Sequence, residues 1–524
     1  MSRKQIGLEP NLVVSVAELG CIESWKLTGP QLIALVPASE YWLIVPDSQV
    51  KQFVDNSPVQ VTVFPESIFT QDFSEKFSRC EGAALPARRG WYLQQLIKLS
   101  ALKKAAHFDR IVIWDADTVP LQDLSFFDFQ GNCRYYLGSE YHLPYFENID
   151  RLLGLDKAHP NSFIAQNFPI TGDQIRAFFS YVEKRHQSEW WNAVINSIDF
   201  DELSGFSEYE TLGTFVSSID KKPLNVQLGA WSRDGNQRWV KKQVSGQRVQ
   251  KVKYDFVAVE RWAGNRYGKH WLVRVLGSLR GYLGRVLAST APLFKLPTES
   301  SRLENYLERI FDVDRNIDVI QIGANDGIQS DPLRRFIQTP GRFFARLIEP
   351  IPYYCQELRN LYNARPDVEI INCAAGSSNS TIDIFHIEPA KAIQMNGNGP
   401  HNNWALGQGS SSRATVVYWI YKNSWRGAAY VERIPDWISA IEKLQVRVIR
   451  TQDFVREAAK TLLVVDVQGM ESEVIRGLSE ENLPRWVVIE EDLGKKAARK
   501  LLIDLGYRVV VAGSDTLFEL NKAK

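Results

Sequence analysis

The chain has 524 residues, of which 44% are hydrophobic and 23% charged, and its formal net charge is +1. The length predicts about three domains, or two large ones, of ordinary globular composition, and the balanced charge gives no case for a nucleic-acid partner. Five cysteines without a C-x-x-C pair indicate free thiols in a reducing cytosol rather than disulfides or a zinc site. No apolar run reaches the ~20 residues of a spanning helix and no signal peptide is visible, so we expect a cytoplasmic protein.

An acidic pair closes the clearest strand pattern of the first half. Short apolar runs alternate with helical patterns over residues 12–64, which predicts a parallel α/β sheet. Ile111–Trp114 then forms an apolar run that leads directly into Asp115 and Asp117. Open α/β sheets bind ligands at strand ends, and two carboxylates there can share a cation that also grips phosphates. Asp115 and Asp117 are therefore candidate ligands of Mg²⁺ or Mn²⁺. The alternative is a surface turn with two solvated acids.

The helix that precedes this strand supplies candidate substrate contacts. Apolar residues line one face of the pattern over residues 90–101, and Gln94, Gln95 and Lys98 fall on the other face. Because this polar face belongs to the helix that leads into the acidic strand, we expect these three side chains to bind substrate.

The segment Ser207-Glu208-Tyr209-Glu210 has two interpretations. Ser207 followed three residues later by Glu210 fits a capping box, which would only begin a helix. Alternatively, Glu208 or Glu210 is a catalytic base that takes a proton from an acceptor hydroxyl, or contacts that acceptor. The pattern does not choose between the two glutamates.

Together, the motifs QQLxKL, DAD and SEYE resemble those of the GT-A glycosyltransferases, and more narrowly those of an uncharacterised bacterial family. The resemblance covers roughly residues 10–240. It implies a GT-A-like domain whose acid pair holds the metal of a nucleotide-sugar donor. A nucleotidyltransferase-like first half is the enzymatic alternative.

Residues 256–301 predict a junction between two domains. Basic and apolar residues interleave over residues 266–287, with an apolar repeat of three and four. Such a basic amphipathic helix suits an anionic membrane surface, and the alternative is a helix that packs its apolar stripe on one of the domains. We therefore expect domains at residues 1–255 and 302–524.

The second half begins with the pattern of a nucleoside-binding sheet. A strand over Ile317–Ile322 leads into a glycine loop, Gly323–Gly327, and a second strand ends at Glu349. Glycines let a backbone approach a ligand closely, and an acid after the second strand can bind ribose hydroxyls. The loop lacks the G-x-G-x-x-G spacing, which argues against NAD.

Four ordered motifs resemble those of the FkbM-type S-adenosylmethionine methyltransferases: IGANDG, LIEPIPYYCQELRN, NCAAG and VVDVQGMESEVIRGL. The resemblance spans roughly residues 302–522 and implies a Rossmann-like class I methyltransferase domain with S-adenosylmethionine as cofactor. By this resemblance, the cofactor is held by Gly323, Asn325, Asp326, Gly327 and Glu349. Asp466 and Glu471 would lie beside the methyl group and the acceptor. Val464 stands where the family often has a lysine.

Two of these roles stay open. Glu471 could instead be an acid in the first turn of a helix, favoured by the helix dipole. Asp466 acts either as a base or, with the acids of Glu490–Asp492, in a second metal site.

The middle of the second half predicts a substrate lid. A third strand is expected over Val368–Gly376, and residues 377–461 are long for one connection. Trp404, Gln408 and Trp419 lie in this connection and offer an aromatic and polar surface.

These patterns predict an α/β protein with two fused enzymes, a metal-dependent glycosyltransferase and an O-methyltransferase. Fusion favours successive steps on one glycan, such as a bacterial surface polysaccharide or its lipid-linked precursor. In the membrane interpretation of the junction, the protein is peripheral at the inner face of the cell membrane. The non-enzymatic alternative for the first half is a glycan-binding scaffold, with only the methyltransferase active.

Overall fold

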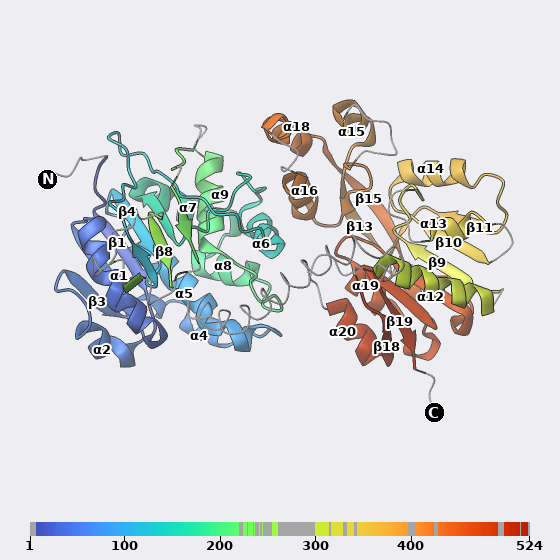
Figure 1. Ribbon diagram of the computed structural model, residues 1–524, viewed down its shortest axis with the longest axis horizontal. Helices are drawn as coiled ribbons and strands as arrows, with labels where there is room; N and C mark the ends of the chain where they lie inside the picture. The colour runs from blue at the N-terminus through green and yellow to red at the C-terminus, as the bar shows by residue number, and fades with distance from the viewer. Residues whose placement is uncertain are drawn as a thin grey trace, which may run out of the picture. The chain divides into compact units, whose positions relative to one another are not determined.

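The computed structural model describes residues 7–219, 224–227, 229–233, 235, 240–241, 244, 254–259, 299–313, 316–328, 333–339, 343–396, 404–423, 428–490, 497–513 and 515–521. The chain divides into two units, Met1–Thr290 and Ala291–Lys524 (Figure 1). The basic segment expected over residues 266–287 lies outside the described residues. Within the described part of the chain, no helix has the length and apolar character that crossing a bilayer requires.

The first unit is built on a five-stranded sheet. Its strands are β1 (Leu12–Val16), β2 (Glu40–Val45), β3 (Val61–Pro65), β4 (Arg110–Trp114) and β6 (Asn167–Thr171). Their order is β3-β2-β1-β4-β6, and β6 alone among these five runs antiparallel to its neighbour. Every residue of β1 is buried, as expected for a strand covered on both faces. The expected α/β architecture is confirmed.

A small second sheet and several helices complete this unit. The small sheet contains β5 (Thr118–Pro120), β8 (Phe256–Ala258) and β7 (Trp231–Ser232), in that order. The helices are α1 (Ile22–Leu35), α2 (Val50–Val54), α3 (Ser67–Thr70), α4 (Ser74–Ser78), α5 (Leu85–Lys104), α6 (Leu143–Leu153), α7 (Gly172–His186), α8 (Trp190–Ser197) and α9 (Glu208–Ile219).

Helices α5 and α9 pack together through buried polar groups. The backbone N–H of Glu208 donates to Gln95 Oε1 at 3.1 Å. Ser207 Oγ accepts the backbone N–H of Glu210 at 3.3 Å, so Ser207 caps α9 as one half of the expected capping box requires. The other half is missing, because the Glu210 carboxylate instead accepts the backbone N–H of Phe163 at 3.0 Å.

The second unit is built on a seven-stranded sheet of order β11-β10-β9-β16-β17-β19-β18. Its strands are β9 (Asp318–Ile322), β10 (Phe344–Ile348), β11 (Val368–Ile371), β16 (Thr461–Val465), β17 (Trp486–Glu490), β18 (Tyr507–Val511) and β19 (Asp515–Leu520). All neighbours are parallel except β19, which is antiparallel to both β17 and β18. The first strands expected from the sequence thus lie side by side, with their carboxyl ends at one edge.

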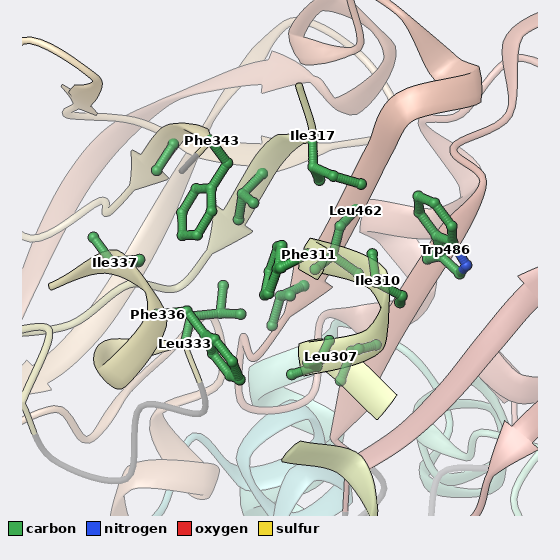
Figure 2. Packing of buried hydrophobic residues seen from close by; sticks show 14 of the residues in the cluster. Leu307, Ile310, Phe311, Ile317, Leu333, Phe336, Ile337, Phe343, Leu462 and Trp486 are labelled. Atoms are coloured by element: carbon green, nitrogen blue, oxygen red, sulfur yellow. The ribbon is translucent and has the colours of Figure 1, made fainter. Parts of the chain in front are cut away.

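Helices cover both faces of this sheet. They include α12 (Glu299–Val313), α13 (Arg334–Ile337), α14 (Pro352–Leu361), α19 (Glu471–Arg476) and α20 (Ala497–Asp504). Buried Leu303, Leu307 and Phe311 recur at helical spacing on α12, which turns one apolar stripe toward the sheet. Figure 2 shows the ring of Phe311 at the centre of this core. The Phe311 ring stacks on the Phe343 ring, with the two ring centroids 4.8 Å apart.

The strand expected over Val368–Gly376 is two strands in two sheets. β11 ends at Ile371, and β12 (Ala374–Gly376) joins a separate sheet of order β12-β15-β13-β14. The break falls at Asn372, whose side-chain amide donates to the backbone carbonyls of Glu349 and Pro350 at 2.9 and 3.0 Å. These bonds tie the chain to the end of β10 and redirect it away from the main sheet.

The separate sheet carries the long connection expected as a lid. Its strands β13 (Ser380–Ile387) and β15 (Ile441–Arg450) pair antiparallel from Ser380 opposite Val448 to Ile387 opposite Ile441. The remaining elements are β14 (Gly409–Ser410), α15 (Pro389–Asn396), α16 (Arg413–Lys422), α17 (Ala428–Glu432) and α18 (Ile434–Ser439).

Candidate active sites

The first unit contains a cleft of about 700 Å³ at the carboxyl ends of β1 and β4. The sequence-predicted residues that line it are Gln94, Gln95, Lys98, Asp115, Asp117 and Glu208. Glu210 does not line the cleft. The structure thus brings together residues that the sequence placed on three separate segments. They lie at the edge of the sheet where open α/β sheets bind their ligands.

Lys98 is the centre of the polar network in this cleft. Its Nζ lies 2.6 Å from Asp115 Oδ1 and 2.7 Å from Glu208 Oε1, and its side chain is only 4% exposed. Burial alone would lower the pKa of Lys98. The two neighbouring carboxylates raise this pKa by more than burial lowers it, so it lies above its ordinary value. Lys98 therefore remains a cation between two acids.

The Asp115 carboxylate is held by three side chains. Its Oδ1 accepts hydrogen bonds from Lys98 and from the Tyr209 hydroxyl, the latter at 2.7 Å. With the Gln166 amide oriented so that both of its ends are satisfied, its nitrogen donates to Asp115 Oδ2 at 3.1 Å and its oxygen accepts from Arg233. Gln166 has a φ of 64°, a conformation that costs free energy and is common at functional sites.

The acid pair fits a shared cation only if substrate completes the coordination. Asp115 Oδ2 keeps one lone-pair direction open, and Asp117 is half-buried at the cleft wall. Among the residues that the structure describes, no group of three or more histidine, cysteine or acidic side chains could hold a metal. Mg²⁺ commonly binds one or two carboxylates plus substrate phosphates, which is the donor set that Asp115 and Asp117 can offer.

The structure separates the two glutamates that the sequence could not rank. Glu208 lines the cleft, and burial raises the pKa of its carboxyl while the Lys98 charge offsets part of this rise. Glu210 instead lies beside Lys157, with Oε2 and Nζ 3.7 Å apart and both side chains 1% exposed. Glu210 therefore holds the loop at Phe163, and of the two glutamates only Glu208 lines the cleft.

Several cleft residues had no sequence signal. Tyr209 lies within the SEYE motif, but its spacing gave no reason to single it out. Gln166, Arg88 and Arg233 come from segments far apart in the chain, and the fold alone brings them to the cleft.

The second unit contains a cavity of about 410 Å³ at the carboxyl ends of β9, β10, β16 and β17. The sequence-predicted residues that line it are Gly323, Asn325, Glu349 and Asp466. Its other wall comes from the separate sheet and α16, and includes Trp404, Gln408 and Trp419.

Glu349 holds the glycine loop against the end of β10. Its two carboxylate oxygens accept the backbone N–H groups of Asn325 and Ile351, each at 2.9 Å. Burial raises the pKa of Glu349 to about 7. Gly323 has a φ of 82°, and a Cβ there would lie 1.8 Å from the backbone oxygen of Asp466, so only glycine fits. The buried acid and the close backbone approach fit a nucleoside-bearing cofactor.

Three predicted residues shape the loops instead of lining the cavity. Asp326 Oδ1 accepts the backbone N–H of Ile328 at 2.9 Å. Gly327 has a φ of 68° and packs close to Leu358. Glu471 begins α19 and accepts the backbone N–H of Gly469 at 3.0 Å, which agrees with the interpretation of Glu471 as an acid of the first helical turn.

Asp466 and Glu490 end two neighbouring strands. The Gln468 amide nitrogen donates to Asp466 Oδ1 at 3.3 Å and to Glu490 Oε2 at 3.2 Å. Burial raises the pKa of the Asp466 carboxyl, and nearby acids add to this rise. Glu491 and Asp492, which the sequence offered as further metal ligands, lie outside the described residues.

The cavity of the second unit lies at the carboxyl ends of parallel strands, where open α/β sheets bind nucleotide-containing cofactors. Comparison with known families makes this specific for the second unit: residues 321–509 match the Methyltransferase FkbM domain. The C-terminal half of the protein therefore carries a methyltransferase FkbM domain. Residues 35–221 match DUF6492, a family of unknown function. No curated protein gave a significant match.

Solved structures gave partial likenesses. The galactosyltransferase LgtC, in complex with donor and acceptor sugar analogues, shares 8% identity over 47% of this chain and 86% of its own, with a TM-score of 0.27. An active-site mutant of LgtC shares 9% identity over the same fractions, with a TM-score of 0.29. A precorrin-6y C5,15-methyltransferase from Geobacter metallireducens GS-15 shares 11% identity over 43% of this chain and 88% of its own, with a TM-score of 0.22. Scores this low carry no inference about activity.

Proposed function

We propose that the protein is a bifunctional glycan-building enzyme. In this proposal the first unit, GT-A-like in fold, transfers a sugar from a nucleotide-sugar with Mg²⁺ or Mn²⁺. The second unit, a class I methyltransferase, methylates a sugar hydroxyl with S-adenosylmethionine. The acceptor is a glycan or lipid-linked glycan, and the setting is bacterial surface polysaccharide synthesis in the cytoplasm. The single observation that carries the first activity is the charge of its cleft, and the FkbM domain carries the second.

The cleft of the first unit needs a cation before it can hold a diphosphate. Its described lining has three basic side chains, Arg88, Lys98 and Arg233. Against them stand six acidic ones, Glu18, Glu66, Asp115, Asp117, Glu140 and Glu208. Two of the three bases already contact acids, Lys98 with Asp115 and Arg233 with Glu140. A diphosphate alone would meet excess negative charge, whereas a divalent cation at the acid pair would compensate both.

Five polar residues of this cleft have distinct roles in the proposal. Asp117 and the open side of Asp115 bind the cation, which supplies charge neutralisation to the donor phosphates. Lys98 and Tyr209 fix the orientation of the Asp115 carboxylate. Glu208 is the base toward the acceptor hydroxyl, because its side chain lines the cleft and burial raises the pKa of its carboxyl, which makes the carboxylate a stronger proton acceptor.

In the second unit, Glu349 accepts the ribose hydroxyls and the loop at Gly323 lets the backbone approach the cofactor. When bound there, S-adenosylmethionine would supply an electrophilic methyl group to the acceptor hydroxyl. Asp466 takes the proton of the acceptor hydroxyl, since its carboxyl is buried beside the cavity and its pKa is raised by that burial.

Nucleotide-sugar turnover by the full-length protein tests the first activity. We expect hydrolysis or transfer that stops in excess chelator and returns with Mn²⁺ or Mg²⁺. Asp117→Asn should abolish it and leave S-adenosylmethionine affinity unchanged. Asp173→Asn, on the exposed surface of α7, is the matched control and should retain turnover.

Other outcomes point to the alternatives. Undiminished glycosyl transfer in excess chelator would refute the metal requirement. Release of pyrophosphate with formation of a nucleotide-sugar would favour nucleotidyl transfer. Glycan binding by the first unit without turnover, alongside an active methyltransferase, would favour the scaffold.

A further inference from the structure

The cavity of the second unit has two walls of different origin. The main sheet supplies Gly323, Asn325, Glu349 and Asp466, which are the residues assigned to the cofactor and the reacting hydroxyl. The opposite wall comes from the separate sheet and α16, which stand together beside the main sheet in Figure 1. This second wall follows the point where the chain leaves the main sheet at Asn372, so an acceptor in the cavity meets its residues together with Asp466, Gln468 and Glu490, which also line the cavity.

The charged side chains among the described lining residues of the cavity are all acidic. Glu349, Asp466 and Glu490 line it, and among the described lining residues none is lysine, arginine or histidine. Glu349 serves the cofactor in the proposed function, which leaves two acids at the acceptor end. A phosphate, sulfate or carboxylate on the reacting sugar would place a third negative charge beside them with no described cation to compensate it.

The hydrogen-bonding groups of the cavity also favour a neutral acceptor. The Gln468 amide nitrogen donates to two carboxylates, Asp466 and Glu490, and this fixes which end of the amide is nitrogen. Gln468 Oε1 and Asn325 Oδ1 are then buried with no hydrogen-bond partner among the residues that the structure describes. Gln468 also has a φ of 50°, a left-handed conformation that is uncommon for residues other than glycine. A cavity that offers unpaired acceptors and carboxylates is complementary to a ligand that brings hydroxyl donors.

The rest of the acceptor wall combines apolar and aromatic side chains with the polar Gln408, Ser410, Ser411 and Asn423. Ile384 of β13, Leu406 and Trp419 line it, and the buried donor Trp419 Nε1 has no acceptor within the described part of the chain. Lys422 lies over the Trp419 ring, with Nζ 4.1 Å from its centroid, but Lys422 is not among the lining residues. Apolar surface with a few oriented polar groups suits the ring of a neutral sugar.

We propose that the methyltransferase accepts only a neutral, hydroxyl-bearing sugar unit, and that Gln468 is a specificity-determining residue that accepts a hydrogen bond from an acceptor hydroxyl. The inference rests on the proposed methylation of a sugar hydroxyl and narrows its substrate class. The reacting unit therefore carries no phosphate or uronic acid group, and methylation follows the reaction that removes the unit from its nucleotide.

A matched panel tests this with the full-length protein and S-adenosylmethionine. The probes are methyl glycosides of glucose, galactose and mannose, each beside its 6-phosphate and its uronic acid. We expect each methylated neutral sugar to react at least about tenfold faster than its anionic counterparts. An anionic member methylated as fast as its neutral partner would overturn the proposal and leave sugar methylation standing. A protein that binds S-adenosylmethionine and methylates no sugar would overturn both.

A variant pair tests the role of Gln468 separately. Gln468→Met keeps the side-chain length and removes the acceptor oxygen together with the amide nitrogen that binds Asp466 and Glu490, so the KM for the neutral sugar should rise about tenfold. The S-adenosylmethionine Kd should stay within about twofold, because Glu349 and the glycine loop are unchanged. Gln356→Met, on the exposed face of α14, should leave both unchanged. An unaltered sugar KM in Gln468→Met, or an equal loss of cofactor affinity, would remove Gln468 from acceptor recognition.

Discussion

Replacing Lys98 with methionine tests whether one buried cation holds the first site together. The substitution keeps the length of the side chain and removes the charge between Asp115 and Glu208. The Lys98 and Glu208 side chains are 4% and 5% exposed, and that of Asp115 is 17% exposed. Water therefore cannot replace the lost cation at Glu208. Breaking a buried ion pair in this way costs about 3–5 kcal/mol, and we expect a loss of this order in the free energy of unfolding of the first unit.

The loss should be specific to the charge at Glu208. In Lys98→Met the Glu208 carboxyl is left buried beside Asp115, whereas Asp115 keeps the Tyr209 and Gln166 hydrogen bonds. Adding Glu208→Gln to Lys98→Met removes the uncompensated charge. We expect the double variant to be about 1–3 kcal/mol more stable than the sum of the single substitutions predicts, as is usual for directly contacting residues.

Urea unfolding of the full-length protein measures both quantities if the two units are distinguished. S-adenosylhomocysteine should shift only the transition of the second unit, which identifies the other transition as that of the first. The reasoning is refuted if Lys98→Met loses less than about 1 kcal/mol and Glu208→Gln gives no rescue.

Three further predictions concern other parts of the chain. Because burial raises the pKa of Glu349 to about 7 from 4.5, its contribution to unfolding stability is present below pH 4.5 and is lost as pH rises through 7. Its ionised form accepts ribose hydroxyls, so calorimetry should show 5′-methylthioadenosine binding tighten about tenfold from about pH 6 to about pH 8; a flat profile, matching that of Glu349→Gln, would remove Glu349 from the site. Gly213→Ala should destabilise the first unit by about 1–3 kcal/mol despite alanine's helix propensity, because the new Cβ would lie 2.1 Å from the Phe163 ring; a rise in stability in urea would contradict this packing. Cosedimentation of the full chain with anionic vesicles should weaken as salt rises if residues 266–287 bind membranes, and no binding at low salt would favour the interdomain alternative.

The sequence predicted strand ends better than side-chain directions. Asp115, Glu349 and Asp466 each follow an apolar run, and the carboxyl ends of parallel strands share one edge, so their placement beside cavities could be anticipated. Glu208 and Glu210 could not be ranked, because the rotation of α9 decides which one lines the cleft. That rotation depends on packing against α5 and on the loop at Phe163.

Other features depended on contacts between distant segments. Lys98 was expected on a polar helix face, and such lysines are usually solvated, but the acids that bury it come from β4 and α9. The break in the strand expected over Val368–Gly376 was hidden because Asn372 redirects the chain through bonds to residues at the end of β10. Gln166 and Arg233 reach the first site only through tertiary structure.

The full pairing of β13 with β15 bears on how this enzyme family could evolve. Ile387 and Ile441 face each other at the end of that ladder, so the chain leaves the ladder and returns to it at one point. When the two ends of a segment are held side by side, as Ile387 and Ile441 are, the segment can be exchanged or lengthened at little cost in chain entropy. It contains Trp404, Gln408 and Trp419 of the acceptor wall and none of the residues assigned to the cofactor. The acceptor contacts of Trp404, Gln408 and Trp419 could thus change by replacement of this segment while Gln468 and the cofactor-binding sheet stay untouched.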